Sequence, residues 1–277
     1  KTFKLLQEKA ADRTNSGYWE FFERDWSHTP SGRDGGDRKS LDVHMHLMEA
    51  FTNLYSAGGD PEHASCTRAL IELITEKMLH TEHGTGIAQF SGDFTPLRTI
   101  LFDNVWGSDR DSDDNGGRPL DNTSYGHNVE LGWLLRWSLY VLGGESEHYG
   151  QTILRLYEHC IHRGIDNERG GVFCEGAFNG PARERNKEFW QQAETLVAML
   201  DGYELSGDER YLEAFGNVHR FVFDHVINHS VGEWLPLLDE YNNVLWDYMG
   251  HRWKINYHTV RSMVECRRRL TEIIESL

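Results

Sequence analysis

Histidines and glutamates at helical spacing are the residues of this chain that could carry out chemistry. His127 and Glu130 stand three positions apart, so both lie on one face of a helix. Trp190 and Glu194, four positions apart, share a face of a later helical segment. His258 opens the last helical segment, where a neutral histidine can act as a base because the helix dipole disfavours the imidazolium. Two such bases on opposite sides of a substrate carbon could remove a proton from one face and return it to the other, which is epimerisation.

The same residues also have a purely structural interpretation, which the sequence leaves open. His127 would then be a capping histidine with Glu130 as its partner. Trp190 and Glu194 would be aromatic core beside a buried salt bridge. Neither interpretation is excluded by spacing alone.

Polar groups recur at one level of three apolar helical runs, counted back from the turn that ends each run. His46, Glu130 and Glu194 lie at this level. A buried polar group costs free energy unless it is paired or does chemistry, so a repeated polar layer indicates a site. His44 and His46 point in different directions on their helix, and His46 is the better candidate.

Metal and cofactor motifs are absent from the sequence. The histidines and carboxylates do not follow the H-E-x-x-H pattern, and there is no P-loop or dinucleotide-binding glycine pattern. The cysteines have no metal-type spacing and do not suggest a disulfide framework in a chain this long; they are Cys66, Cys160, Cys174 and Cys266. We therefore expect no cofactor, no metal and a cytoplasmic location.

The charge balance argues against several classes of partner. Lys and Arg number 28 against 44 Asp and Glu, a net charge of −16 at pH 7, which repels phosphate backbones and anionic membranes. Hydrophobic residues make up 39% of the chain, and no apolar run approaches the roughly 20 residues that would span a bilayer. We expect a soluble protein with no nucleic-acid or membrane partner.

The elements that must position the candidate residues form a repeated unit. Three apolar runs predict inner helices, at Leu41–Phe51, Tyr125–Leu142 and Phe189–Leu205. Each run ends in a glycine turn typical of a helix C-cap followed by a new helix, at 57–60, 142–145 and 205–208. Four further segments predict small β-hairpins between helix pairs, at 16–20, 85–89, 170–174 and 231–234.

Such a helical-hairpin unit cannot bury its apolar face alone, so units must pack side by side. Each unit takes about 60 residues, and without the Asp/Gly-rich insertion at Trp106 to Asn122 the chain holds roughly four. Six units would close a ring. We expect residues 1–277 to be a single all-α domain of the (α/α)6 barrel type, a toroid of helical hairpins that lacks its N-terminal hairpins in this chain.

Four blocks occur in order along the chain: Lys39–Tyr55, Ser124–Leu135, Lys187–Glu194, and Trp253-Lys254 followed by Tyr257-His258. Together they resemble the N-acylglucosamine 2-epimerase superfamily, and within it the cellobiose 2-epimerases. The resemblance implies the (α/α)6 barrel. It also implies a cofactor-independent reaction, in which the sugar ring opens and a proton then moves at C2 through a cis-enediolate.

The resemblance further implies roles for individual residues. His127 and His258 match the paired acid/base histidines of the family. Glu130 and Glu194 match the carboxylates that orient or assist them. An arginine that steadies the enediolate oxygens in the family is expected in an N-terminal hairpin outside this chain.

The same resemblance indicates that His46, Trp133, Trp190 and Trp253 contact the sugar, and we expect Asp42 and Tyr125 to contact it as well. Trp190 would stack on the reacting ring and Trp253 on a second ring. The chain departs from the family pattern at Asp42, Phe189 and Asn256, where Asn, Trp and Pro are usual. An extra carboxylate near the sugar could move the contacts to its hydroxyl groups, so preference for a disaccharide stays open.

The leading hypothesis is a sugar 2-epimerase acting on a free reducing aldose, such as a β-1,4-linked disaccharide of the cellobiose or mannobiose type. One alternative returns the proton at C1, giving an aldose–ketose isomerase of the mannose-to-fructose kind, and another takes N-acylglucosamine. A glycoside hydrolase would use two carboxylates with a water or nucleophile between them, and a binding protein would not need the two histidines. We expect a small sugar as substrate and a monomer or homodimer.

Overall fold

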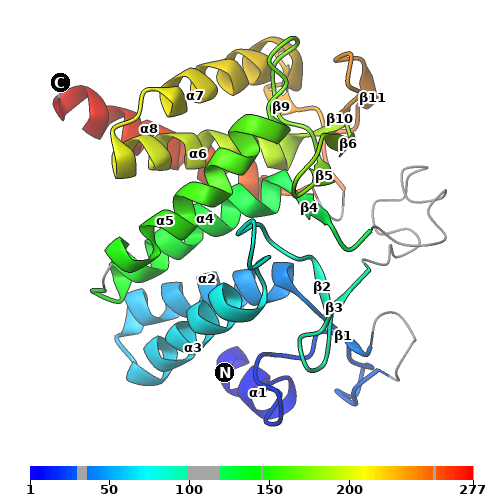
Figure 1. The fold of residues 1–277 in the computed structure, drawn as a ribbon, viewed down its shortest axis with the longest axis vertical. Coiled ribbons are helices and arrows are strands. Elements are labelled where there is room, and N and C mark those ends of the chain that lie inside the picture. The colour runs from blue at the N-terminus through cyan, green and yellow to red at the C-terminus, as the bar shows by residue number, and fades with distance from the viewer. Residues whose placement is uncertain (30–35, 99–118, 145, 252–253, 277) are drawn as a thin grey trace. The chain divides into compact units, whose positions relative to one another are not determined.

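The computed structural model describes residues 1–29, 36–98, 119–144, 146–251 and 254–276 (Figure 1). Most of the predicted insertion at Trp106 to Asn122 lies outside these residues, and so does Trp253. The helices are α1 (Thr2–Lys9), α2 (Leu41–Gly58), α3 (Pro61–Lys77), α4 (Tyr125–Val141), α5 (Ser146–His159), α6 (Phe189–Ser206), α7 (Arg210–Phe221) and α8 (Asn256–Ser276). Short π-helical turns extend α5 and α7, at Cys160–Gly164 and Val222–Val226.

The strands are two or three residues long: β1 (Arg38–Ser40), β2 (Gln89–Ser91), β3 (Pro96–Leu97), β4 (Asn122–Ser124), β5 (Glu175–Ala177), β6 (Ala182–Glu184), β7 (Lys187–Glu188), β8 (Ile227–Asn228), β9 (Glu233–Trp234), β10 (Leu237–Leu238) and β11 (Val244–Trp246). They form three three-stranded sheets, in the orders β1-β2-β3, β4-β5-β6 and β11-β10-β7, and the hairpin β8-β9. The predicted hairpin at 231–234 is confirmed as β8-β9. At the other three predicted positions the chain forms isolated antiparallel bridges, Ala11 with Tyr18, Leu79 with Gly86 and Ile165 with Val172. The sheets were not predicted, because strands this short carry too few residues for an alternating pattern.

The three predicted inner helices are confirmed as α2, α4 and α6, and burial distinguishes α6 from the helix that follows it. Nearly every residue of α6 from Phe189 to Gly202 is buried, which is typical of a helix surrounded by protein. The following helix, α7, buries a single stripe made of Tyr211, Ala214, Val218 and Phe221. α6 packs against α7 and α8, and α2 packs against α3 (Figure 1).

Local signals in the sequence explain where these helices begin and end. The Ser40 hydroxyl caps α2 by accepting a hydrogen bond from Val43 N at 3.2 Å. Gly59 and Gly207 close α2 and α6 with φ of 67° and 69°, in the left-handed region that favours glycine. The predicted turns at 57–60 and 205–208 are therefore confirmed as helix C-caps, and in the third turn Gly143 has a φ of 65°.

Buried lysines join two of the loops to the start of the inner helix that follows. Lys39, directly before α2, donates to Asp12 Oδ2 at 2.7 Å and to the Ser16 carbonyl at 2.7 Å. Lys187, directly before α6, donates to Asp166 Oδ2 at 2.9 Å and to the Gly170 carbonyl at 2.8 Å. A fully buried ammonium is stable only with such partners, so these contacts fix where α2 and α6 start.

Internal contacts group the chain into two compact units. The first contains residues 1–82, 86–122 and 138–144, and the second contains 83–85, 123–137 and 145–277. The single-domain organisation expected from the sequence stays a prediction. All four cysteines are free, and among the described residues no helix is long and apolar enough to cross a membrane.

Candidate active site

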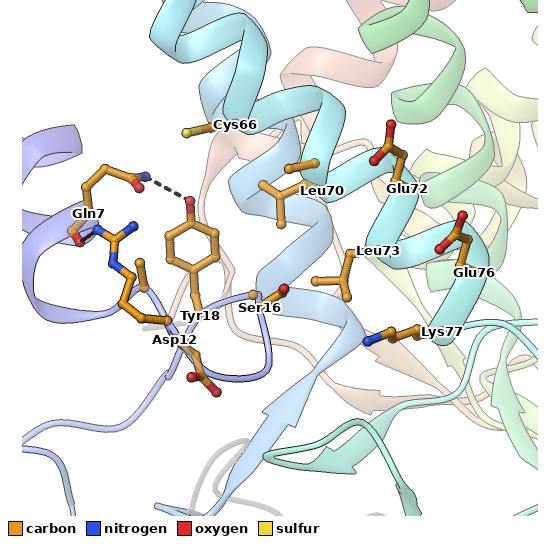
Figure 2. Close-up of a pocket in the computed structure, with 14 residues that line it drawn as sticks. Gln7, Asp12, Ser16, Tyr18, Cys66, Leu70, Glu72, Leu73, Glu76 and Lys77 are labelled. Atoms are coloured by element: carbon orange, nitrogen blue, oxygen red, sulfur yellow. Dashed lines mark hydrogen bonds between the residues drawn. The ribbon is translucent and has the colours of Figure 1, made fainter.

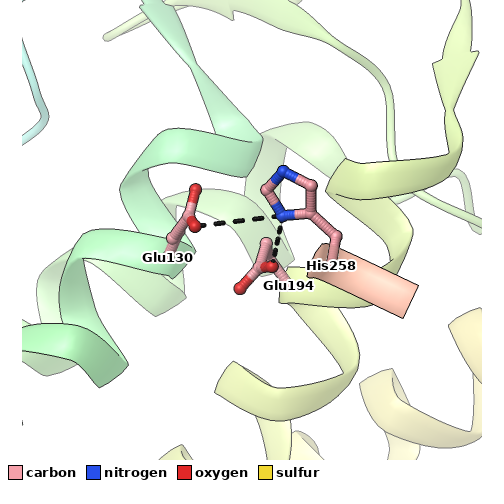
Figure 3. A group of neighbouring side chains, drawn as sticks. All are labelled: Glu130, Glu194 and His258. Carbon is pink, nitrogen blue, oxygen red and sulfur yellow. Dashed lines mark hydrogen bonds and ion pairs between the residues drawn. The ribbon is translucent and has the colours of Figure 1, made fainter. Parts of the chain in front are cut away.

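Three helices of the second unit bring two carboxylates and an imidazole together (Figure 3), and the Arg261 guanidinium joins them. Glu194 on α6 places Oε1 2.7 Å from His258 Nδ1 and 2.7 Å from Arg261 Nη2, both on α8. Glu130 on α4 places its own Oε1 2.7 Å from the same Arg261 nitrogen and 3.9 Å from His258 Nδ1. The predicted grouping of Glu130, Glu194 and His258 is therefore present, with Arg261 as an additional member.

Glu194 is held as an anion inside the protein. Its side chain is fully buried, and its second oxygen, Oε2, accepts a hydrogen bond from Trp133 Nε1 at 2.9 Å. Burial by itself raises the pKa of Glu194, but the Arg261 charge and the contacts with His258 outweigh burial and lower the pKa well below its usual range. The carboxylate is therefore ionised at neutral pH.

The position of Glu194 also fixes the tautomer of His258. A carboxylate can only accept hydrogen bonds, so the proton between the two residues belongs to His258 Nδ1. In the neutral ring the lone pair then lies on Nε2, on the side of the ring directed away from both carboxylates (Figure 3). A nitrogen in that state can take a proton from a ligand.

Trp190, near the start of α6, contacts both candidate histidine rings. Its ring centroid lies 4.8 Å from that of His127 and 5.4 Å from that of His258. Glu188 orients the indole by accepting from Trp190 Nε1 at 2.7 Å. Gly126 permits this approach, because a Cβ there would lie 2.8 Å from the Trp190 ring. The structure thus joins Trp190, His127 and His258 in one cluster.

Arg261 is the member of the cluster to which we assigned no role from sequence. Its guanidinium lies 4.7 Å from the Trp133 ring centroid and 3.9 Å from that of Tyr257. Arg261 follows His258 by three positions, so the two share one face of α8. That spacing was the available signal, but which carboxylates the arginine meets depends on how α8 packs against α4 and α6.

Tyr125 has contacts different from those expected of a sugar-binding residue. Its side chain is fully buried, its ring stacks on His159 at 5.3 Å between centroids, and it lies against Gly164 and Gly176. Burial raises the pKa of Tyr125 above its usual range. The structure therefore places Tyr125 in the packing between α4 and the β5 hairpin, and its contact with a sugar stays a prediction.

His46 and Asp42 belong to the first unit. His46 Nε2 lies 3.3 Å from Asp42 Oδ1, and Nδ1 lies 3.2 Å from Glu49 Oε2, with a third of the imidazole side chain exposed. His44, by contrast, is fully buried, accepts from Tyr18 N at 3.0 Å and contacts the Ser40 carbonyl at 2.7 Å, and burial lowers its pKa to about 4. This burial supports the preference for His46 as the candidate, and its contact with a sugar stays a prediction.

Glu130, Glu194 and His258 also have the composition of a metal site, with one donor atom from each within 4.8 Å of the others. However, Arg261 Nη2 already binds Oε1 of both carboxylates. A divalent cation there would have to displace a guanidinium or lie beside its positive charge, so these donors fit an arginine-filled site better than a metal site.

A cavity of about 410 Å³ opens in the first unit between the loop after α1 and helix α3 (Figure 2). Tyr18, Leu70 and Leu73 form apolar parts of its lining, and Glu72 and Lys77 are among its charged residues. None of the residues predicted to act on or bind a sugar lines it. The cavity is therefore separate from the cluster on α4, α6 and α8.

Known proteins match this chain over most of its length. The sequence profile of the N-acylglucosamine 2-epimerase (GlcNAc 2-epimerase) family matches residues 1–262. The cellobiose 2-epimerase of Bacteroides fragilis is 26% identical over 272 residues, 96% of this chain and 63% of that protein. The D-mannose isomerase of Marinomonas mediterranea is 22% identical, over 98% of this chain and 64% of that protein. The chain thus spans slightly less than two thirds of the length of these relatives.

The fold of this chain is also similar to that of a solved structure. The cellobiose 2-epimerase from Spirochaeta thermophila superposes with a TM-score of 0.81 and 28% sequence identity, over 99% of this chain and 64% of that chain. The expected fold class, all-α of the (α/α)6 barrel type, is confirmed by this similarity.

Proposed function

The chain belongs to the N-acylglucosamine 2-epimerase family, and on that premise we propose that it is a sugar 2-epimerase acting on a free reducing aldose. One observation carries the proposal: the Trp190 ring contacts both His127 and His258. An aromatic ring offers a flat apolar surface to a sugar. A sugar stacked on Trp190 would therefore meet two imidazoles, the pair that epimerisation requires.

The proposed reaction begins after the sugar ring has opened to the aldehyde. A neutral histidine removes the C2 proton and becomes an imidazolium, and the electron pair of the C–H bond forms the cis-enediolate. The second histidine, protonated, gives its proton to the opposite face of C2, so the aldose returns with inverted C2. His127 and His258 take these two roles, and their roles exchange when the reaction runs in reverse.

Glu194 and Arg261 support this chemistry through charge. The ionised Glu194 bonds His258 Nδ1, so it stabilises the imidazolium that forms when His258 takes a proton at Nε2. Arg261 binds the oxygens of Glu130 and Glu194 and keeps two adjacent carboxylates from repelling each other. Glu130 and Glu194 are thus positioning residues, and the histidines do the proton transfer.

The proposed substrate class is a β-1,4-linked disaccharide of the cellobiose or mannobiose type. Similarity to the cellobiose 2-epimerase of Bacteroides fragilis supports this choice. Similarity to a D-mannose isomerase supports a second candidate, in which the same enediolate is protonated at C1 and a ketose forms. N-acylglucosamine, the substrate in the family's description, comes third.

A glycoside hydrolase is disfavoured by the geometry of the carboxylates. One oxygen of Glu130 lies within 4.8 Å of one oxygen of Glu194, and their Oε1 atoms share one guanidinium nitrogen. Hydrolases separate two carboxyl groups by about 5–5.5 Å or about 6.5–9.5 Å, with the glycosidic bond between them. An arginine in that position leaves no room for the bond.

NMR of candidate sugars incubated with the protein in deuterium oxide tests the proposal. Deuterium at C2 of an aldose product, with inverted configuration, is the expected result. A ketose product would instead establish the isomerase, and release of new reducing ends would establish a hydrolase. An absence of exchange in cellobiose, mannobiose, mannose and N-acetylglucosamine would contradict the proposed function.

A further inference from the structure

An aromatic cluster lies at the end of β11, outside the group of residues assigned above. Trp246 and Tyr248 stack with ring centroids 5.7 Å apart and an interplanar angle of 24°. His251 meets Tyr248 edge-on at 5.1 Å. Tyr248 is 38% exposed, and the neighbouring Met249 is 36% exposed. Exposed apolar surface of this kind marks interaction sites, and stacked aromatic rings suit the flat apolar faces of sugars.

The sheet register places this cluster on the same side as the candidate active site. In the sheet β11-β10-β7, Leu237 is paired with Trp246 on one side and with Glu188 on the other. Residues paired across strands point to one face, and a bulge beside Leu237 sets this pairing. Glu188 is the residue that holds the indole of Trp190. Trp246 therefore lies two strand spacings, about 10 Å, from Glu188 on the same face.

A second set of contacts fixes the segment that carries Tyr248. Lys254 is buried, donates to the Met249 carbonyl at 2.7 Å, and pairs with Glu233 at 3.0 Å. Its ammonium also lies 5.3 Å from the Phe189 ring centroid, and that ring lies 6.2 Å from the His258 ring. The backbone beside Tyr248 is thus anchored to the start of α6, next to the candidate base.

We propose that Trp246 and Tyr248 form a distal sugar-binding platform, on which the non-reducing part of a β-1,4-linked oligosaccharide rests while its reducing end lies at His127 and His258. The separation of about 10 Å between Trp246 and Glu188 is more than one sugar ring spans. A second unit bridges this gap, so the platform meets the third unit, and substrates of three or more units gain most. The inference rests on the proposed epimerase function for where the reducing end binds.

The test compares Tyr248→Ala with the wild-type protein on cellotriose and cellobiose, and on the matching manno-oligosaccharides. Loss of the exposed ring is expected to raise the KM ratio of trisaccharide to disaccharide about tenfold, which corresponds to about 1.4 kcal/mol. Tyr248→Phe keeps the ring and should keep the ratio. Tyr241→Ala is the matched control, because Tyr241 is 61% exposed and its ring stacks with Arg169, 5.3 Å away.

Binding of borohydride-reduced cellotriose, measured by titration calorimetry, separates this inference from the proposed function. The reduced sugar has no aldehyde and cannot react, so it reports the platform even if no sugar is epimerised. A dissociation constant about tenfold weaker in Tyr248→Ala supports the platform. Equal binding by wild type and variant, or a KM change of the same size for disaccharide and trisaccharide, would overturn it. Thermal melting of each variant verifies that it folds.

Discussion

Two ionic layers join helices α4, α6 and α8 of the second unit, and they differ in one respect. The first layer is the candidate active site around Glu194. The second lies two helical turns farther along α6 and is centred on Asp201. In it, Asp201 Oδ1 binds Arg136 and Arg269 at 2.7 Å each, and Glu204 pairs with the same arginines. The Tyr157 hydroxyl donates to Asp201 Oδ2 at 2.8 Å.

The two layers contain the same kinds of charge in different proportions. In the second layer the two arginines face the two carboxylates Asp201 and Glu204, so these four formal charges cancel, while Glu265, 3.6 Å from Arg269, also pairs with Arg268. The first layer has one arginine, Arg261, for Glu130 and Glu194, and a histidine stands where a second arginine would balance them. An arginine keeps its charge and only holds the carboxylates together, whereas an imidazole can both accept and donate a proton. We infer that the second layer holds the helices and the first does the chemistry.

The largest expected effect is the loss of turnover when either of the two proposed bases is replaced. His127→Asn and His258→Asn should each lower turnover by about 10²–10⁴-fold, since each removes one general acid or base. Substrate affinity should change much less, because stacking on Trp190 remains. Steady-state kinetics with the aldose identified by the deuterium experiment measures both quantities. Near-normal epimerisation by both variants would refute the assignment of two bases.

Glu194→Gln tests whether the charge of the first layer matters apart from the bases. The amide has a single carbonyl oxygen, so it can still accept from His258 but then turns its NH2 towards Trp133 Nε1. It also carries no charge to stabilise an imidazolium, so turnover should fall about 100-fold. Binding of the reduced disaccharide should be nearly unchanged. A variant that turns over like the wild type would show that Glu194 is needed only for packing.

Replacing a residue of the second layer should lower stability more than turnover. Asp201→Asn leaves Arg136 and Arg269 with less buried negative charge, and breaking such a buried pair costs about 3–5 kcal/mol of stability. Urea unfolding measures this loss, and turnover below the melting transition should fall less than for Glu194→Gln. If Asp201→Asn inactivates the protein without destabilising it, the inference that the second layer only holds the helices together is wrong.

A smaller effect concerns pH and His159, which stacks on Tyr125. Burial lowers the pKa of His159 to about 4, against about 6.5 in an unfolded chain. Between these values the unfolded state binds more protons, so stability rises with pH in this window and is lost as pH falls from about 6.5 towards 4. His159→Phe should reduce that slope, as measured by urea unfolding at pH 7, 6 and 5. An unchanged slope would mean that His159 titrates alike in both states.

The smallest expected effect is that of a chelator. Because Arg261 already binds the oxygens that Glu130 and Glu194 could offer a metal, EDTA should leave turnover unchanged. The measurement is turnover before and after dialysis against EDTA, followed by addition of single divalent ions. Loss of activity that one ion restores would instead assign Glu130, Glu194 and His258 as metal ligands.

The sequence by itself determined the local structure and much of the candidate site. Glycine turns, helix starts and the spacing of His127 with Glu130 are set by neighbours along the chain, so short patterns reveal them. His258, Glu130 and Glu194 were correctly expected to come together, because an ordered set of motifs resembled a known family.

Only the tertiary structure decided which groups meet across helices. Arg261 lies 131 residues from Glu130 and 67 from Glu194 along the chain, and nothing in the α8 pattern says that its guanidinium meets both. Tyr125 occupies a promising position in sequence, yet its ring packs against Gly164 and Gly176. The pairing of β10 with β7 and β11, which places Trp246 on the same sheet face as Glu188, was also not predicted. These contacts depend on packing angles and side-chain volumes, which a local sequence pattern does not specify.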